Sequence, residues 1–563
     1  MGCRNELTRQ TGPRGGAESG RAKVSLTRFA KPDDPRTMSR RPAGRLSAVA
    51  ILVGLTGVLA ACDSRDQGSQ AAVTGRIAPE TLEPSNLERW ADETFGALLE
   101  EHRISALAIS VTHGDKVVFK KGYGYHDYAT RRPIDPDVSQ FRIGSLTKTF
   151  FGTAIAQLLE RGEIASLDDP VNRYLTRIQL QNPFGDDEIT IRDMVTHQGG
   201  MVPRGSRSPF TSVGEERPQP PLSAAVLEAN LPPVVRDPGT FSDYCNACSA
   251  VMGFMVEDIT GRTLEEYLRE NVYEPLGMTH TTLVNSLQAP SADVVTQYAF
   301  ATGEPPVALV YPSLTPFISY AGDINSTAGD MARFVRAHAL QGSGSTLSLM
   351  APESYEVMHR WDRGNHPDAS GFGIQFFRYD HNGEPVIEHY GSIRYRSLEI
   401  IMLDAQVGVF VTMAGGGEPN PDELAAADTS LEPVAGPVLP QASHSGVRAL
   451  VLEHFLGRLP IDESLEVDVG QYTGLYHRIP ADQGETPGGG GRLVADSGDG
   501  GLVIDGLGPY RPSGPDAFTL DGQLPVEAGF RDSNRYVFAR QSDGSMHMFA
   551  HVNAGGFVRA ARE

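Results

Sequence analysis

The chain has 563 residues, more than one hydrophobic core usually serves, so its length predicts two folded domains with less ordered ends. It carries 49 Lys and Arg against 70 Asp and Glu, a formal net charge of -21 at pH 7. This excess of negative charge repels nucleic acid and anionic lipid surfaces, which argues against binding to either.

The first 61 residues predict an export signal. Residues 1–45 hold eleven Lys and Arg against four Asp and Glu, and residues 46–61 contain no charged side chain. An apolar run of this length is short for a membrane span but suits a signal peptide. The sequence Leu-Ala-Ala-Cys at 59–62 resembles a bacterial lipobox, which implies cleavage before Cys62 and lipidation of that cysteine. A simple signal peptide and an N-terminal buried helix are the alternatives.

Two features of the leader bear on its start and on the location of the protein. Met38, followed by several arginines, would make an ordinary signal n-region, and residues 1–37 would then not be translated. Asp63 after the predicted lipidated cysteine resembles an inner-membrane retention signal of Gram-negative lipoproteins. We therefore expect a lipoprotein of the bacterial cell envelope, at the periplasmic face of the inner membrane, with residues 62–84 as a polar tether.

Beyond the tether, the hydrophobic pattern predicts one helix and two strands. Residues 87–101 are amphipathic, and the alternating runs at 106–111 and 116–120 are typical of strands joined by a hairpin turn. Residues 147–160 are apolar on nearly every face and end at Gly162, which predicts a buried helix with a glycine C-cap.

Further along, helices and then strands are predicted. Thr190 and Thr263 begin capping-box patterns, and Gly261 ends the apolar helix that follows Tyr244. Strand-like runs return at 372–378, 397–403 and 407–413. Strands on both sides of a mainly helical middle predict a sheet covered by helices.

The last part of the chain has a different texture. Residues 416–445 are rich in Gly, Pro and acids and predict a surface excursion before a last helix at 447–456. We expect the first domain to cover residues 85–460. Short strand-like runs separated by glycines then predict a small antiparallel barrel or sandwich over 466–563, with runs at 493–495, 502–504, 517–520, 536–540 and 546–552.

Four cysteines occur, of which Cys3 and Cys62 belong to the leader. Cys245 and Cys248 have C-x-x-C spacing, but no second pair completes a zinc site. Two packed thiols are the favoured interpretation, and a local redox bridge is the alternative.

The sequence Ser145-Leu146-Thr147-Lys148 places a serine one helical turn before a lysine. Positions i and i+3 share a helix face, and burial favours the neutral amine that could take a proton from the serine. About one such spacing is expected by chance in a chain of this size. The chain has only six lysines against 43 arginines, however, and Lys148 is the only one after Lys121. Since arginine cannot serve as a neutral base, we favour a functional pair.

A second segment, Tyr244-Cys245-Asn246, lies at the start of the helix that ends at Gly261. A phenol there could shuttle a proton, and an amide could orient a substrate. Alone, a tyrosine at a helix start is usually a packing residue.

With a third segment, His-Tyr-Gly-Ser at 389–392, these residues resemble the serine β-lactamase-related family. Its members include class C β-lactamases, penicillin-binding D,D-peptidases, D-aminopeptidases and esterases. Other segments agree over most of residues 85–415, namely LDDP at 167–170, THQGG at 196–200, EPLGM at 274–278 and STAGDM at 326–331. The resemblance implies an α+β fold, an antiparallel sheet flanked by helices plus an all-helical region, with the serine at their junction.

The resemblance also implies roles for individual residues. Ser145 would attack a carbonyl carbon to form an acyl-enzyme, Lys148 and Tyr244 would take and return the proton, and Asn246 would hold the substrate amide or ester. The backbone N–H groups of Ser145 and Ser392 would bind the oxyanion, as preorganised donors do in acyl transfer. No cofactor and no metal are expected.

One departure from the family pattern concerns the third segment, in which Gly391 and its neighbours would bind substrate. Relatives that hold a carboxylate usually have Lys at the position of His389, and histidine is mostly neutral at pH 7. The carboxylate anchor is therefore weakened unless Arg394 or Arg396 reaches into the site. We expect an esterase or D-amino-acid peptidase rather than a β-lactamase. Its substrate would be a small molecule or a peptide, and the cell wall is one source of such a substrate.

The C-terminal segment predicts an appendage and no metal site. From about Val467 the chain resembles the lipocalin-like appendage of some family members. His547 and His551 share one strand face but have no third ligand, and neither H-E-x-x-H nor G-x-S-x-G occurs. The alternative to an enzyme is a penicillin-binding-like cell-wall sensor or binding lipoprotein that does not turn over.

The leader yields a direct prediction. In a bacterium that processes lipoproteins, the mature chain should begin at an acylated Cys62, because the lipobox directs both cleavage and lipidation. Intact-mass spectrometry of the membrane fraction measures this. Cys62→Ala should keep its leader, whereas equal processing of both chains would indicate a simple signal peptide.

Overall fold

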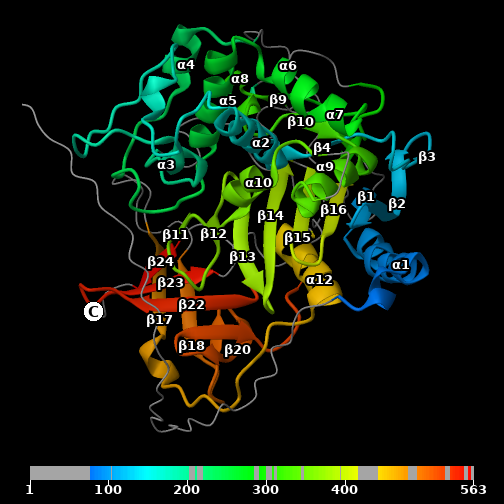
Figure 1. Cartoon of the computed structure of the whole chain (residues 1–563). Helices are drawn as coiled ribbons and strands as arrows, with labels where there is room; N and C mark the ends of the chain where they lie inside the picture. Colours follow the sequence, from blue (N-terminus) through cyan, green and yellow to red (C-terminus); the bar gives the residue numbers. More distant parts are fainter. Residues whose placement is uncertain are drawn as a thin grey trace, which may run out of the picture. The chain divides into compact units, whose positions relative to one another are not determined.

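The structure is a computed structural model of the whole chain (Figure 1). It describes residues 77–102, 104–201, 210–211, 220–283, 291–299, 307–309, 313–343, 348–393, 395–415, 442–479, 491–525, 533–550 and 556–559. The chain divides into two units, Met1–Gln70 and Ala71–Glu563, and every described residue belongs to the second. The leader with Cys62 and Asp63, the tether to residue 76, Arg394, nearly all of 416–445 and His551 lie outside the described residues, so predictions about them stay predictions.

The centre of the fold is a nine-stranded sheet with the order β11-β12-β13-β14-β15-β16-β1-β2-β3, in which every neighbouring pair is antiparallel. The strands are β1 (Ile104–His113), β2 (Lys116–Asp127), β3 (Arg132–Pro133), β11 (Arg363–Gly364), β12 (Gly371–Phe372), β13 (Phe377–His381), β14 (Glu384–Ile393), β15 (Tyr395–Met402) and β16 (Val407–Gly415). Along the two central strands, β1 and β16, every residue except His113 is buried. Such continuous burial requires cover on both faces of the sheet.

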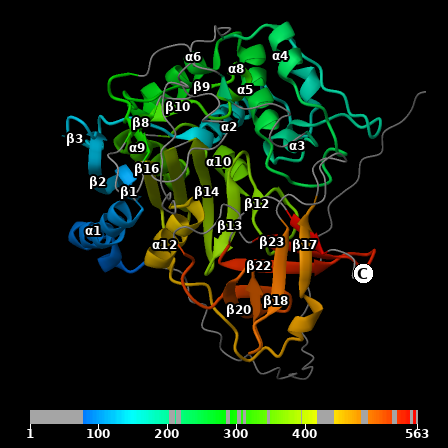
Figure 2. The same cartoon turned by 180° about the vertical axis from the view of Figure 1, so that it is seen from behind.

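Helices provide this cover, as Figures 1 and 2 show from opposite sides. On one face, α1 (Pro84–Glu101) packs against β1 and α12 (His444–Leu456) against β15, in one core that includes Leu107 and Ile109 of β1. The β1 side chains on the other face include Ala106 and Ala108. They belong to a second core with side chains of α2 (Thr147–Glu160), α9 (Ala328–Leu340) and α10 (Pro352–His359). The period-two alternation of the strand thus divides the domain into two apolar cores.

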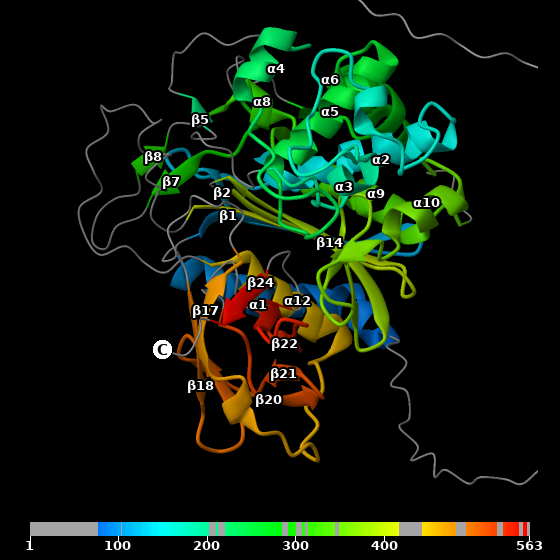
Figure 3. The same cartoon turned by 90° about the vertical axis from the view of Figure 1, so that its left-hand side faces the viewer.

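A helical region adjoins α2 and surrounds α5, as Figure 3 shows. It comprises α3 (Ile191–Val195), α4 (Ala224–Asn230), α5 (Asn246–Thr260), α6 (Leu264–Leu268), a π-turn (Arg269–Tyr273), α7 (Glu274–Leu276) and α8 (Pro316–Ser319). Thr190 and Thr263 form complete capping boxes, and Gly261 ends α5 with φ 66°. The helix starts and stops predicted at these three residues are confirmed.

Several short strands bridge the elements. They are β4 (Phe141–Arg142), β5 (Phe210–Thr211), β6 (Thr282–Leu283), β7 (Gln297–Ala299), β8 (Val307–Leu309), β9 (Ser313–Leu314) and β10 (Ile324–Ser326). The order β4-β10-β6 joins the segment before α2 to the segment before α9.

The C-terminal strands form a closed antiparallel barrel (orange to red in Figure 1). They are β17 (Gly474–Arg478), β18 (Arg492–Asp496), β19 (Leu502–Ile504), β20 (Leu507–Gly514), β21 (Ala517–Leu520), β22 (Arg535–Arg540), β23 (Met546–Ala550) and β24 (Gly556–Arg559). Buried aromatic side chains such as Tyr476, Phe518 and Phe538 fill its interior. Together with the covered sheet, the barrel confirms the predicted fold class.

The structure corrects one predicted strand and adds others. The run at 372–378 is not one strand, because β12 ends at Phe372 and β13 begins at Phe377. Between them Gln375 has φ 63°, and its N–H donates to the Val195 carbonyl at 3.2 Å, which draws this stretch toward α3. Two strands that no pattern predicted are β14, which buries Glu388 and His389, and β20, which contains two prolines.

An ion pair between Arg142 and Asp323 is fully buried beside β4 and β10, with both side chains about 1% exposed. We expect Asp323→Ala to lower the free energy of unfolding by about 3–5 kcal/mol, because it leaves the guanidinium buried without its counter-charge. Urea denaturation measures this loss. Lys120→Ala, which breaks the exposed pair with Asp137, should cost less than about 1 kcal/mol, and similar losses in both variants would contradict the prediction.

Candidate active site

The site lies at the junction between β4 and the buried helix α2. Ser145 lies in the 3-10 turn Gly144–Leu146, and Lys148 lies in the first turn of α2. Nζ of Lys148 lies 3.0 Å from Oγ of Ser145 and donates to the carbonyl of Ala321 at 2.8 Å. The predicted serine and lysine are therefore in hydrogen-bond contact.

The surroundings of Lys148 favour its neutral form. Its side chain has no exposed surface, and burial holds its pKa well below the usual value. Its two hydrogen-bond partners among the described residues, Oγ of Ser145 and the carbonyl of Ala321, are uncharged oxygens, so neither supplies a negative charge that would retain the proton. A neutral amine with one hydrogen directed to Ala321 can take the proton of the serine hydroxyl.

Backbone hydrogen bonds fix the turn that carries Ser145. The hydroxyl of Thr147 donates to the Gly144 carbonyl at 2.7 Å and accepts from the N–H of Ile324 at 3.1 Å. The N–H of Ile143 donates to the carbonyl of Ile324 at 2.9 Å. The segment at 321–324 thus holds both the turn and, through Ala321, the amine.

Strand β14 comes so close to this turn that only glycine fits at the contact. A Cβ on Gly391 would lie 1.8 Å from the Ile143 oxygen and 3.1 Å from the Ser145 nitrogen. On the other side, Gly144 has φ +60°, and a Cβ there would lie 3.1 Å from the Ser392 nitrogen. The backbone nitrogens of Ser145 and Ser392 therefore both lie at this contact, and the oxyanion hole expected of them stays a prediction.

Tyr244 lies beside the same pair. Nζ of Lys148 is 5.1 Å from the centre of its ring. Burial raises the pKa of the phenol above its usual value, and the nearby Ser145 side chain partly offsets that rise. The phenol oxygen is buried and makes no hydrogen bond within the described residues. A protonated phenol next to Ser145 can donate a proton to a leaving group.

His389 also lies near Tyr244, with ring centres 5.9 Å apart. It is fully buried, and burial, with further effects of Lys148 and His197, holds its pKa well below the usual value. Its Nδ1 lies 2.9 Å from the carbonyl of Tyr390, so the proton of the neutral ring belongs on Nδ1. Nε2 is then a buried acceptor that has no partner among the described residues. The third segment therefore contributes a neutral acceptor here, not a cation.

The other candidate residues are less directly placed. Asn246 is the half-exposed first residue of α5, and within the described part of the chain no hydrogen bond joins it to Ser145 or Lys148. Arg396 is paired in register with Ser392. Burial, with a further effect of the Arg396 charge, lowers the pKa of His444, whose ring contacts the Gly391 carbonyl. Within the described ranges, no group of three or more His, Cys, Asp or Glu could hold a metal ion.

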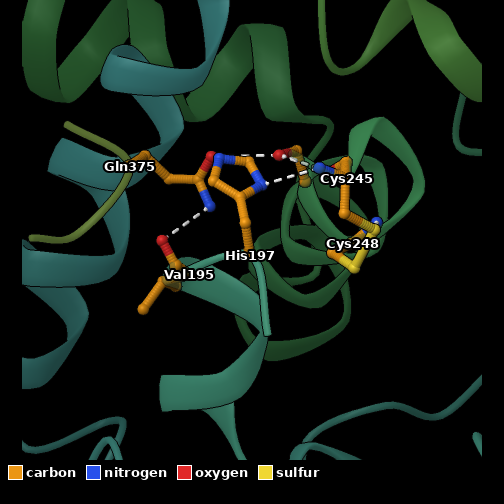
Figure 4. The surroundings of a disulfide bond; sticks show 6 residues. Val195, His197, Cys245, Cys248 and Gln375 are labelled. Atoms are coloured by element: carbon orange, nitrogen blue, oxygen red, sulfur yellow. Dashed lines mark hydrogen bonds between the residues drawn. A yellow bond between two sulfur atoms is a disulfide. The ribbon is translucent and has the colours of Figure 1, made fainter. Parts of the chain in front are cut away.

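The prediction of two packed thiols is wrong, because Cys245 and Cys248 form a disulfide (Figure 4). Cys245 is the N-cap of α5, and Cys248 lies one turn later on the same face, with 5.3 Å between their Cα atoms. That separation suits a disulfide. The bridge is buried directly after Tyr244.

The sequence did not predict two groups of the site, the carbonyl of Ala321 and the side chain of His197. The Ala321 carbonyl is a backbone group, and no side-chain pattern announces it. His197 stacks on Tyr244 with ring centres 4.6 Å apart. It lies in the segment Thr-His-Gln-Gly-Gly at 196–200. This segment contributed to the family resemblance, but the sequence assigned its histidine no function.

Comparison with known proteins agrees with this geometry. The Beta-lactamase family model matches residues 91–431, more than half of the chain. The putative penicillin-binding protein PbpX of Bacillus subtilis is 27% identical over 316 residues, which cover 53% of this chain and 72% of that protein. A D-aminopeptidase of Brucella anthropi is 28% identical over 201 residues, 36% of this chain and 37% of the relative.

Among solved structures, the octameric penicillin-binding protein homologue from Pyrococcus abyssi has a TM-score of 0.51 and 21% identity. The match covers 84% of this chain and 100% of that chain. At this identity the likeness concerns the fold alone.

The close contact at Gly391 can be tested by one methyl group. Gly391→Ala should lower the free energy of unfolding by about 1–3 kcal/mol, because β14 must move away from the turn. It should also slow acylation of Ser145, measured with a fluorophosphonate, because the two backbone nitrogens separate. Gly96→Ala, in an open position of α1, should gain about 0.5–1 kcal/mol and label normally. Normal labelling of Gly391→Ala would contradict the prediction.

Proposed function

The chain belongs to the Beta-lactamase family, and from this premise we propose that it is a serine hydrolase that works through an acyl-enzyme on Ser145. The observation that carries the proposal is the fully buried amine of Lys148 at hydrogen-bond distance from Ser145 Oγ. A desolvated amine with neutral partners is a base at neutral pH, which is what activation of a serine hydroxyl needs.

In the acylation half of the reaction, Lys148 takes the proton of Ser145 as Oγ bonds to the substrate carbonyl carbon. The N–H groups of Ser145 and Ser392 stabilise the negative charge that develops on the carbonyl oxygen. The proton then passes through Tyr244 to the leaving oxygen or nitrogen, and the bond from the carbonyl carbon to that atom breaks. The products are the free leaving group and an ester on Ser145.

In the second half, water attacks the ester carbonyl carbon and gives a proton to the Tyr244 and Lys148 pair. The bond between Oγ and the acyl carbon breaks, and Ser145 regains its proton. The acid is released with the enzyme in its starting state, so no cofactor takes part in the cycle.

We favour an ester or a D-amino-acid amide over a β-lactam as substrate. His389 presents a neutral acceptor where a lysine ammonium would bind a carboxylate, and burial lowers its pKa further. A neutral group attracts a substrate carboxylate only weakly. The relative named as a D-aminopeptidase supports the amide class, with cell-wall peptides as one source of such substrates.

The second candidate function is a cell-wall sensor that is acylated without turnover. The relative named as a penicillin-binding protein favours it, because that name describes binding. Both functions need Ser145 and Lys148, and they differ only in the fate of the acyl-enzyme.

We also propose that the protein acts as a lipid-anchored protein of the bacterial envelope. The disulfide at Cys245 and Cys248 supports an oxidising compartment, since such bonds persist outside the reducing cytosol.

The proposed function is tested with the full chain and a fluorophosphonate. We expect the parent and Ser464→Ala, a change at an exposed serine, to gain one adduct by intact mass, and Ser145→Ala to gain none. The parent should then turn over short-chain p-nitrophenyl esters or D-amino-acid p-nitroanilides continuously.

Other outcomes would contradict specific parts of the proposal. A parent that does not label has no activated serine, which would favour a binding protein. One product per enzyme without a steady rate would support the sensor. Faster hydrolysis of nitrocefin than of the esters and amides would overturn the substrate preference.

A further inference from the structure

Tyr244 lies outside regular secondary structure. Residues 241–245 belong to no helix or strand, and α5 begins only at Asn246. Proton transfer needs donor and acceptor atoms within about 2.6–3.2 Å of each other, so an irregular segment must be held in place by specific contacts.

One residue supplies three of these contacts. The carbonyl of His197 accepts from the N–H of Asp243 at 3.0 Å, and its Nδ1 accepts from the N–H of Cys245 at 3.0 Å. Between these two anchors the His197 ring stacks on the Tyr244 ring at an interplanar angle of 27°. Figure 4 shows the imidazole of His197 directed toward the Cys245 backbone beside the disulfide. His197 thus binds the residue before Tyr244, the residue after it and the ring itself.

This arrangement carries an energetic cost. His197 has φ 58°, a left-handed conformation that non-glycine residues rarely adopt, and its side chain is buried. Because Nδ1 accepts a backbone N–H, the proton of the neutral imidazole lies on Nε2, which has no partner among the described residues. Burial and the nearby Lys148 lower the pKa of His197 to about 3, so the ring stays neutral at working pH. Backbone strain and a buried unpaired donor persist only where the surrounding structure enforces them.

Other groups hold the ends of the same segment. The side chain of Asn365 accepts from the N–H of Ser242 at 2.8 Å and donates to its carbonyl at 2.7 Å. The disulfide ties Cys245 to the first turn of α5. These contacts fix the backbone on either side, whereas His197 also contacts the phenol ring.

From these contacts we infer that His197 is a positioning residue, which holds the Tyr244 phenol where it can pass a proton to the leaving group. The inference rests on the proposed function. It assigns His197 no contact with substrate, so its whole effect on the rate passes through Tyr244.

The leaving group separates this role from a merely structural one. Phenyl acetate has a poorer leaving group than p-nitrophenyl acetate and depends more on protonation. In the full chain, His197→Ala should lower kcat/KM for phenyl acetate by about 10- to 100-fold, the usual effect of a misplaced catalytic group. The loss for p-nitrophenyl acetate should be clearly smaller, as in Tyr244→Phe. Equal losses for both esters, or no loss, would overturn the inference.

A double-mutant cycle gives an independent readout. If His197 acts through Tyr244, then His197→Ala should cost less than about twofold in a Tyr244→Phe background. Multiplying losses would show that His197 acts elsewhere and would overturn the inference.

Two conservative variants keep the test valid if the alanine variant does not fold. His197→Asn keeps an acceptor for the Cys245 N–H and tolerates the positive φ, and His197→Phe keeps the ring against Tyr244. Each should recover part of the phenyl acetate rate, and a folded variant that recovers none would overturn the inference.

Failure of the inference can be told apart from failure of the proposed function. The adduct that forms on the parent and not on Ser145→Ala reports the function without any change at His197. If that adduct forms and the His197 variants behave as the parent, the function stands and the inference falls.

Discussion

The burial of one amine beside one hydroxyl governs the organisation of this site. Lys148 can act as a base only if water and negative charge are kept away from it, since either would restore its ordinary affinity for a proton. The apolar character of α2 on nearly every face follows from this requirement, because a helix with a polar side would bring solvent to the amine. The choice of the Ala321 carbonyl as second partner follows as well, because a carbonyl orients the amine without charging it.

A second constraint, the close approach of two backbones, links the sheet to the helical region. Gly144 and Gly391 let β14 come within contact of the turn that carries Ser145. One side of that contact is fixed by β10 and its neighbours, and the other by the long ladders of the sheet. Lys148 comes from α2 and Tyr244 from the segment just before α5, so the candidate site exists only where the sheet, α2 and the helical region meet.

Much of this could be predicted from the sequence, and the exceptions have physical causes. The apolar period of α2, the capping boxes and the barrel strands are local patterns, and the pairing of Ser145 with Lys148 follows from helical spacing. Strand β14 was not predicted because its polar core residues hide the alternation, and no simple spacing distinguishes a bridged pair of cysteines from two thiols. His197 escaped because its role depends on a contact with a segment 47 residues away, which only the folded chain reveals.

The pairing of β1 with β16 also determines when the central sheet can form during folding. Ile104 faces Gly415 across the ladder, so β1 cannot take its place in the sheet until β16 has been synthesised. Contacts between residues so far apart in sequence form slowly, and until they form, the apolar strands stay exposed to aggregation. During synthesis the ribosome must therefore deliver some three hundred residues beyond β1 before the central sheet can close. Until then the nascent chain stays unfolded, which is the state that the proposed export across a membrane would need.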